Sequence, residues 1–323
     1  MSSELESRTT RIGLVVDSAC DLSHDFLDQH NVVVMPIAVR IDQTTFSDER
    51  DPDATLRFYR QSLGERGHAA ETLPFTVEQI RELFLSRLVR DFDFVICLTV
   101  ASSRSPIHEN AVLASREILR YYHPIRKEAG LKGIFQMRVI DSQTLFAGQG
   151  ITALEAIRMI EAGEHSNTIR ERMEQLAPNT YGYMLPRDLY YLRARAAKKG
   201  DRSVSWLSAT LGTALDIKPI LRGYRNQTSP VGKVRGFDAG IKTLFEYVSE
   251  RVRIGLMAPY VNLSYGGELD KLHAMPGYDQ LARTCEEHNV QISSCVMSIT
   301  GMVNVGEGAV TIGFAAEPHA TKF

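Results

Sequence analysis

The segment FDFVICLTV, residues 92–100, is a nearly continuous apolar run. A strand that is covered on both faces, as in a parallel sheet between helices, has this composition. Amphipathic helical patterns occur on both sides of it, at 76–91 and 107–122. Strands separated by helices of this kind are typical of βαβ units. The segment therefore predicts a parallel β-sheet with helices packed against it.

The rest of the first half repeats this alternation. Short β-branched runs predict further strands, and apolar residues at helical spacing predict further helices. The strands are expected at 11–19, 31–41 and 135–141, and the helices at 23–31, 54–67 and 147–162.

The second half has a different pattern, in which hairpin-like segments lie beside helices and indicate a mixed sheet. Strands are expected at 180–185, 254–265, 290–299 and 309–317, two strands around a turn at 217–234, and helices at 166–177, 186–200, 203–215 and 237–252. The polar stretch AGEHSN interrupts the pattern at 162–167. We therefore expect an α/β protein with a parallel-sheet domain at 10–165 and a mixed-sheet α/β domain at 166–318.

Composition excludes several classes of protein. The 323 residues carry 37 Lys and Arg against 39 Asp and Glu, a net charge of −2, so no bulk positive field attracts nucleic acid. No stretch approaches the roughly 20 apolar residues of a membrane helix, so we expect no stable membrane insertion. The polar start MSSELESRTTR lacks the apolar middle of a secretory signal, which predicts a cytoplasmic protein.

The four cysteines, at 20, 97, 285 and 295, form neither a CxxC pair nor a zinc spacing. Isolated thiols in a reduced cytosol are the main interpretation, and a catalytic thiol is the alternative. The sequence also lacks a GxxxxGK[ST] loop, a GxSxG elbow and an HExxH motif. We therefore expect neither a metal nor a cofactor, and a protein that is not an enzyme.

Three strand ends carry small hydroxyl or acidic residues, and ligands of open α/β sheets bind beyond such ends. They are Asp17-Ser18, the run Thr99–Ser105 with Ser102 and Ser105, and Asp141-Ser142. Hydroxyls and free N–H groups at helix starts bind anions, although they are also ordinary helix caps. A third interpretation makes Asp17 and Asp141 the acid and base of an enzyme.

Two further regions are candidates for contact with a ligand or a partner. The glycine-rich run 301–308, with Asn304 and Gly306, is expected to be a loop in which the backbone approaches a ligand or forms a turn. Arg202, Lys233 and Arg235 belong to the densest basic stretches. They are either solvated surface or a docking site for an acidic head group or an acidic protein.

Five motifs in register resemble the DegV family of bacterial fatty-acid-binding proteins. They are GLVVDSACDLS at 13–23, VASSRSPIHENA at 100–111, VIDSQTLFAGQG at 139–150, LDIKPIL at 215–221 with GKVRGFDAGIKTL at 232–244, and NVGEGAVTIGF at 304–314. The resemblance implies that the first domain carries the head-group loops and that the second covers an acyl tunnel. One long-chain fatty acid is held between them, and its carboxylate is presented to a separate fatty acid kinase.

The resemblance also assigns residues. Ser105 matches the family's head-group serine and Ser102 the second serine of its S-S pair. The head-group threonine aligns with Glu71 or is displaced to Thr72. The family's loop histidine is Asn304 here, and Pro106 replaces a glycine. Because Glu71 and Asn304 suit a neutral head group, a different acyl ligand or a small polar ligand is the alternative to a free fatty acid.

Overall fold

The computed structural model describes residues 10–61, 70–190, 192–193 and 216–323. Its first sheet is entirely parallel, in the order β2-β1-β6-β7. Its strands are β1 (Ile12–Asp17), β2 (Val33–Met35), β6 (Phe94–Thr99) and β7 (Gln136–Asp141). Every residue of β6 is buried, which confirms the parallel sheet expected from the apolar run at 92–100.

Side chains alternate across this sheet and create two separate cores. On one face Val15, Val95 and Cys97 pack with the helices α3 (Val77–Leu83) and α5 (Ile107–Glu117). On the other face Leu14 and Val16 pack with α7 (Ala147–Glu161) and α8 (Ser166–Leu176). The remaining short helices of this half are α1 (His24–Gln29), α2 (Pro52–Arg60), the π-helical Phe84–Leu88, α4 (Val89–Asp91), the 3₁₀ turn Ile118–Arg120 and α6 (Tyr122–Glu128).

A small antiparallel sheet, in the order β4-β3-β5, was not expected from the sequence. It contains β3 (Ile37–Ile41), β4 (Thr44–Asp48) and β5 (Ala70–Pro74). The run at 31–41 was interpreted as one strand region. In the structure β2 ends at Met35 and β3 begins at Ile37, so the chain passes from one sheet to another at Pro36. Proline lacks the N–H that an uninterrupted strand needs, which explains the break.

The second half forms a six-stranded mixed sheet, in the order β10-β9-β8-β13-β11-β12, in which only β11 and β12 are parallel neighbours. Its strands are β8 (Thr180–Leu185, after the 3₁₀ turn Ala177–Asn179), β9 (Ile217–Tyr224), β10 (Gln227–Arg235), β11 (Tyr260–Tyr265), β12 (Gln291–Val296) and β13 (Val310–Ala315). Its helices are α11 (Phe237–Ile254), α12 (Leu269–His273), α13 (Tyr278–Glu287) and α14 (Ile299–Val305). The mixed sheet expected for this half is confirmed.

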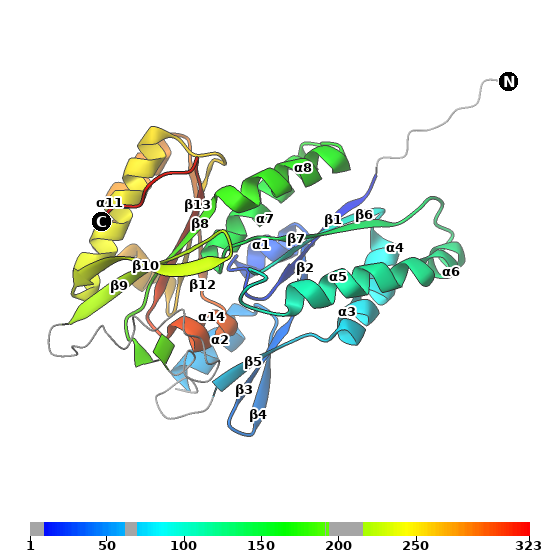
Figure 1. The fold of residues 1–323 in the computed structure, drawn as a ribbon, viewed down its shortest axis with the longest axis horizontal. Helices are drawn as coiled ribbons and strands as arrows, with labels where there is room; N and C mark the ends of the chain where they lie inside the picture. The colour runs from blue at the N-terminus through cyan, green and yellow to red at the C-terminus, as the bar shows by residue number, and fades with distance from the viewer. Residues whose placement is uncertain (1–9, 62–69, 191, 194–215) are drawn as a thin grey trace.

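The two faces of this sheet differ in chemistry. One face presents large apolar side chains to α11 and α13, including Tyr183, Leu263 and Phe314. The other face presents small or polar residues toward α7, which lies between the two large sheets (Figure 1). A Cβ added at Gly313 would lie 2.3 Å from the carbonyl oxygen of Ala147, so only glycine lets α7 approach this closely.

Two expectations need comment. The run 301–308 was expected to be a loop, but residues up to Val305 belong to α14, because Ser298 caps the helix by accepting from the backbone N of Gly301 at 2.9 Å. The domain boundary expected between residues 165 and 166 stays a proposal. Met173 of α8 packs in the same core as Val16, which favours a boundary nearer to β8.

Candidate functional site

The loop that follows β6, residues 100–105, is held at its start by consecutive backbone N–H groups. The N–H of Val100 donates to Asp17 Oδ2 at 2.6 Å, and that of Ser102 donates to Asp141 Oδ1 at 3.1 Å. Between them, the N–H of Ala101 donates to the carbonyl of Thr144 at 3.0 Å. The structure therefore brings the three predicted strand ends together around this loop, which we call the head-group loop.

Asp17 is fully buried at the end of β1. Its Oδ1 also accepts from the N–H of Ala19 at 3.0 Å. Burial raises the pKa of this carboxyl to about 7, while the hydrogen bonds from Val100, Ala19 and Gln149 oppose the rise. Asp17 thus acts on the head-group loop as a hydrogen-bond acceptor.

Ser18 and Ser142 are also buried, and their hydroxyls bind within the chain. Ser18 Oγ accepts from the N–H of Ile37 at 2.9 Å, and Ser142 Oγ donates to the carbonyl of Thr144 at 3.3 Å. Ser142 thus forms a local turn contact, whereas Ser18 binds the start of β3, 19 positions away, so both hydroxyls have structural partners.

Ser105 lies at the start of α5 and is half-buried. Its Oγ accepts from the N–H of Ile107 at 3.3 Å, and Pro106 occupies the N-cap position in a helical conformation. Pro106 therefore suits the local backbone. Because the contact to Ile107 uses the oxygen as an acceptor, the O–H of Ser105 is able to donate to a ligand.

The cross-strand register separates Glu71 from Thr72. Glu71 lies opposite Arg40, and the two side chains form an ion pair. Thr72 lies opposite Val39, which is buried against α14. Because neighbouring residues of a strand point to opposite faces, Thr72 faces the interior and Glu71 does not. A displaced threonine at 72 fits the family pattern better than Glu71.

Asn304 and Gly306 lie at the end of α14. Asn304 Nδ2 donates to the carbonyl of Thr300 at 2.7 Å. Gly306 ends the helix with φ 102°, a value that favours glycine. α14 packs on β3 and β5, so Asn304 and Thr72 belong to neighbouring elements. The chain after β5 is joined in turn to α5, because Asn110 donates to the carbonyl of Phe75 at 2.8 Å.

An apolar cluster adjoins these polar residues and connects the two halves of the chain. From the first half it includes Val100 and Ala101, which begin the head-group loop, and Ile107, which follows it. From the second half it includes Met184, Leu221, Met297, Val305 and Ala309. The apolar side chains of this cluster would surround a long apolar group, and residues with hydroxyl groups lie at the edge of the cluster.

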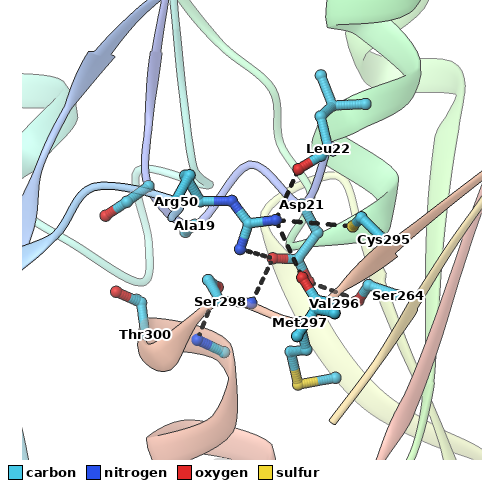
Figure 2. A network of polar contacts seen from close by, with 12 residues as sticks. Ala19, Asp21, Leu22, Arg50, Ser264, Cys295, Val296, Met297, Ser298 and Thr300 are labelled. Atoms are coloured by element: carbon cyan, nitrogen blue, oxygen red, sulfur yellow. Dashed lines mark hydrogen bonds and ion pairs between the residues drawn. The ribbon is translucent and has the colours of Figure 1, made fainter. Parts of the chain in front are cut away.

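A buried charged cluster, which the sequence did not predict, lies between the halves (Figure 2). Arg50 Nη1 lies 3.2 Å from Asp21 Oδ1, and their side chains are 3% and 0% exposed. The Nη2 group of Arg50 donates to the carbonyls of Leu22 at 2.7 Å and Val296 at 3.1 Å. Asp21 occurs in the first motif, DSACDLS, but a lone arginine at position 50 gives no sequence signal.

The two acidic residues of this cluster also bind the start of α14. Asp21 Oδ1 accepts from the N–H of Ser298 at 3.1 Å, and Asp48 Oδ2 accepts from the N–H of Thr300 at 2.8 Å. Burial alone would lower the pKa of Arg50, but the carboxylates of Asp21 and Asp48 raise it, so the guanidinium stays charged. The cluster therefore fixes α14, and with it Asn304, to the first half.

The remaining predicted residues lie elsewhere. Lys233 and Arg235 are exposed on β10, an edge strand of the mixed sheet. Arg202 and the greater part of the helices expected at 186–200 and 203–215 lie outside the described residues. All four cysteines are buried, and burial raises the pKa of each thiol, which disfavours a thiolate nucleophile.

Within the described part of the chain, His, Cys, Asp and Glu form no group of three or more that could hold a metal ion. The same residues include no helix with the length and apolar content to cross a membrane.

A family profile described as "Uncharacterised protein, DegV family" matches residues 11–317. The chain belongs to the DegV family. A DegV domain-containing protein of Xanthomonas axonopodis pv. citri is 57% identical over 310 residues, which are 96% of this chain and 99% of that protein. The resemblance seen in the five motifs is thereby confirmed.

Solved structures of the DegV family share the fold. DegV of Bacillus subtilis, described as a fatty acid binding protein, has a TM-score of 0.73 at 18% identity and covers 95% of this chain and 100% of its own. A stearic acid-binding protein of Eubacterium ventriosum has a TM-score of 0.71 at 21% identity, with 94% and 98% covered. The expected α/β fold with one parallel and one mixed sheet is confirmed.

Proposed function

We propose that this DegV protein is a carrier that holds a long-chain fatty acid between its two halves and presents the carboxylate to a partner such as a fatty acid kinase. The observation that carries the proposal is the apolar cluster that joins the halves next to the head-group loop, which carries Ser105. The names of the B. subtilis and E. ventriosum relatives support a fatty acid as the ligand.

The free energy gained by burying an acyl chain is large enough to hold such a ligand. Each buried CH₂ contributes about 0.8 kcal/mol, so a chain of about 16 carbons supplies of order 10 kcal/mol before the costs of binding. The carboxylate then needs a few donors and no buried cation. Thr72 and Ser105 supply O–H donors and Asn304 supplies an amide, while Ser102 and the acidic strand ends hold the loop. Gly306, with φ 102°, ends α14 directly after Asn304 and Val305.

Extraction tests the ligand. Purified protein is denatured, and the extract is examined by mass spectrometry for a fatty acid of about 14–18 carbons. Ser105→Ala and Thr72→Val should each weaken oleate binding about 10- to 100-fold, since a hydrogen bond to a charged group is lost. The control is Ser115→Ala, further along α5, where the hydroxyl donates to the carbonyl of Val112. Repeated extracts without lipid, together with no thermal shift on adding fatty acids, would contradict the proposal.

The basic residues of β10 are proposed to dock the partner, together with Arg202. Lys233→Glu with Arg235→Glu should weaken the contact with an acidic kinase surface, and the loss should shrink at high salt because exposed charges are screened. Oleate binding should be unchanged. Lys242→Glu with Lys271→Glu, at exposed ion pairs with Glu246 and Glu268, is the charge-matched control. Equal loss of kinase and oleate binding would show that β10 supports the pocket instead.

Two alternatives remain open to test. Asn304 does not titrate, so a different acyl ligand or a small polar ligand would suit it; tight binding of an acyl alcohol without any response to oleate would favour that ligand. An enzyme that uses Asp17 and Asp141 is the second alternative. Both carboxylates accept backbone N–H groups of the head-group loop, which favours a positioning role. Turnover that is lost in Asp141→Asn while the fold persists would reverse this conclusion.

We also propose a cytoplasmic location. Four free cysteines without a disulfide fit a reducing compartment.

A further inference from the structure

The turn between β9 and β10 reaches the head-group loop from the opposite half of the protein. Tyr224 pairs with Gln227, so the turn has two residues, Arg225 and Asn226, with φ values of 48° and 63°. Two consecutive positive φ values at a two-residue turn are characteristic of type I′. Asparagine tolerates this conformation better than most residues. The backbone therefore presents the Asn226 side chain at the tip of the hairpin.

Asn226 makes four contacts with the first half. Its backbone N–H donates to the carbonyl of Gln143 at 3.0 Å, and its carbonyl accepts from Ser103 Oγ at 2.6 Å. Its side-chain Nδ2 donates to Asp141 Oδ2 at 2.8 Å, and its Oδ1 accepts from Ser102 Oγ at 3.4 Å. Both side-chain contacts therefore end on residues that hold or form the head-group loop.

Asp141 connects the turn to the loop directly. While Oδ2 accepts from Asn226, Oδ1 accepts from the N–H groups of Ser102 and Gln143. From Ser102 the loop continues through the hydrogen bond between the N–H of Arg104 and the carbonyl of Ala101, at 2.8 Å, to Ser105. Two residues, Ser103 and Arg104, therefore separate the proposed head-group serine, Ser105, from Ser102, where the turn is anchored.

The chemistry of this contact requires asparagine. Its amide supplies one donor to the carboxylate and one acceptor to the hydroxyl, in a residue that accepts positive φ. Glycine would keep the backbone conformation and lose both side-chain contacts. Aspartate would keep the shape, lose the donor and repel Asp141. Because Ser102 and Ser103 are exposed, water is able to replace these bonds when the turn moves away.

We propose that Asn226 is a positioning residue for the head-group loop, and that the turn acts as a latch whose opening governs the rate at which the bound fatty acid leaves. The inference rests on the proposed function, because it concerns retention of the same ligand. It adds a residue of the second half, outside the head-group residues, to the determinants of ligand release.

The test is the transfer of radiolabelled oleate from the full-length protein to phosphatidylcholine vesicles. Asn226→Gly should release oleate about tenfold faster, which corresponds to about 1.4 kcal/mol. Its thermal unfolding should stay close to that of the wild type. Asn289→Gly is the matched control, since Asn289 also has a positive φ, of 54°, and lies exposed after α13. It should release oleate at the wild-type rate.

The decisive variant is a reversed pair, in which the side chains of Asn226 and Asp141 are exchanged. Asn226→Asp alone should release oleate at least as fast as Asn226→Gly, because two carboxylates then face each other. Combining it with Asp141→Asn restores one amide and one carboxylate in exchanged positions, and slow release should return. Unchanged release in Asn226→Gly, or fast release in the reversed pair, overturns the inference while leaving the carrier function in place. A wild-type protein that binds no oleate overturns the proposed function, and the inference with it.

Discussion

Two of the polar crossings between the halves of the protein have opposite character. At one, the charged group Arg50 is buried with Asp21 and binds carbonyls of both halves. At the other, the neutral side chain of Asn226 reaches the exposed Ser102 and the half-buried carboxylate of Asp141. Both crossings bring a candidate ligand residue into place, Asn304 in the first case and Ser105 in the second.

The two crossings differ in the free energy that it costs to break their contacts. Separating Arg50 from its carboxylates would leave unpaired charges in the interior, at a cost of about 3–5 kcal/mol. Opening the Asn226 turn exchanges hydrogen bonds for bonds to water, with a net cost of about 1 kcal/mol each. The halves are therefore expected to separate first at the Asn226 turn and to remain joined at Arg50.

The largest effect is expected for Arg50→Met. The substitution leaves Asp21 and Asp48 as buried carboxylates without a counter-charge, so the free energy of unfolding should fall by about 3–5 kcal/mol. Urea unfolding measures it. Arg60→Met is the control, because Arg60 pairs with Glu268 at 3.2 Å while the side chains are 65% and 50% exposed. That change should cost at most about 1 kcal/mol. Equal losses in both variants would contradict the distinction between buried and exposed pairs.

A second effect concerns Asp17, which carries a raised pKa of about 7 beside the head-group loop. The folded state keeps its proton to a higher pH than the unfolded state, so Asp17 makes the protein less stable as pH rises. Between pH 5 and pH 7.5 its contribution to the free energy of unfolding should fall by about 2–3 kcal/mol, and no further loss is expected well above pH 7. Asp17→Asn should remove this part of the slope in urea unfolding. Parallel pH curves for the two proteins would refute the assignment.

Ser264→Ala should have an intermediate effect. Ser264 Oγ donates to Asp21 Oδ2 at 2.5 Å inside the charged cluster, and losing a bond to a buried charge costs about 1.5–2 kcal/mol. Ser249→Ala is the control, because Ser249 is equally buried but donates only to the carbonyl of Phe245 within α11. Thermal unfolding of both variants compares them. A larger loss for Ser249→Ala would argue against a special role of the charged cluster.

The smallest effect on stability is expected for Asn226→Gly, at most about 1 kcal/mol, since the turn keeps its conformation and water replaces the lost partners. Hydrogen exchange should nevertheless become faster at the N–H groups of Ser102 and Gln143. The exchange at Ser298, which binds Asp21, should not change. Accelerated exchange at all three sites would mean that the two crossings open together.

Much of the fold was predictable because the spacing of apolar and polar residues within a segment indicates its secondary structure. The apolar run at 92–100 predicted the buried strand β6, and the hairpin-like segments at 217–234 predicted β9 and β10. The sheet of β3, β4 and β5 was missed because a single proline redirects the chain at 36. α14 was missed because Gly301, Gly306 and Gly308 in the run 301–308 favour a loop when only neighbouring residues are considered, whereas the contacts of Ser298 and Thr300 stabilise the helix start.

The candidate site likewise has features that the sequence predicts and features that only the tertiary structure shows. The sequence by itself determined the family, the two types of sheet and the strand ends where Asp17, Ser102 and Asp141 meet, because periodicity and motif spacing depend on residues close in the chain. Only the tertiary structure decided that Arg50 pairs with Asp21, that Thr72 and not Glu71 faces the interior, and that Asn226 reaches the head-group loop. Arg50 binds the carbonyl of Val296 across 246 positions of sequence, and Ser102 binds Asn226 across 124. Partners so distant in the chain are selected by the packing of the two sheets around α7, which no local pattern encodes.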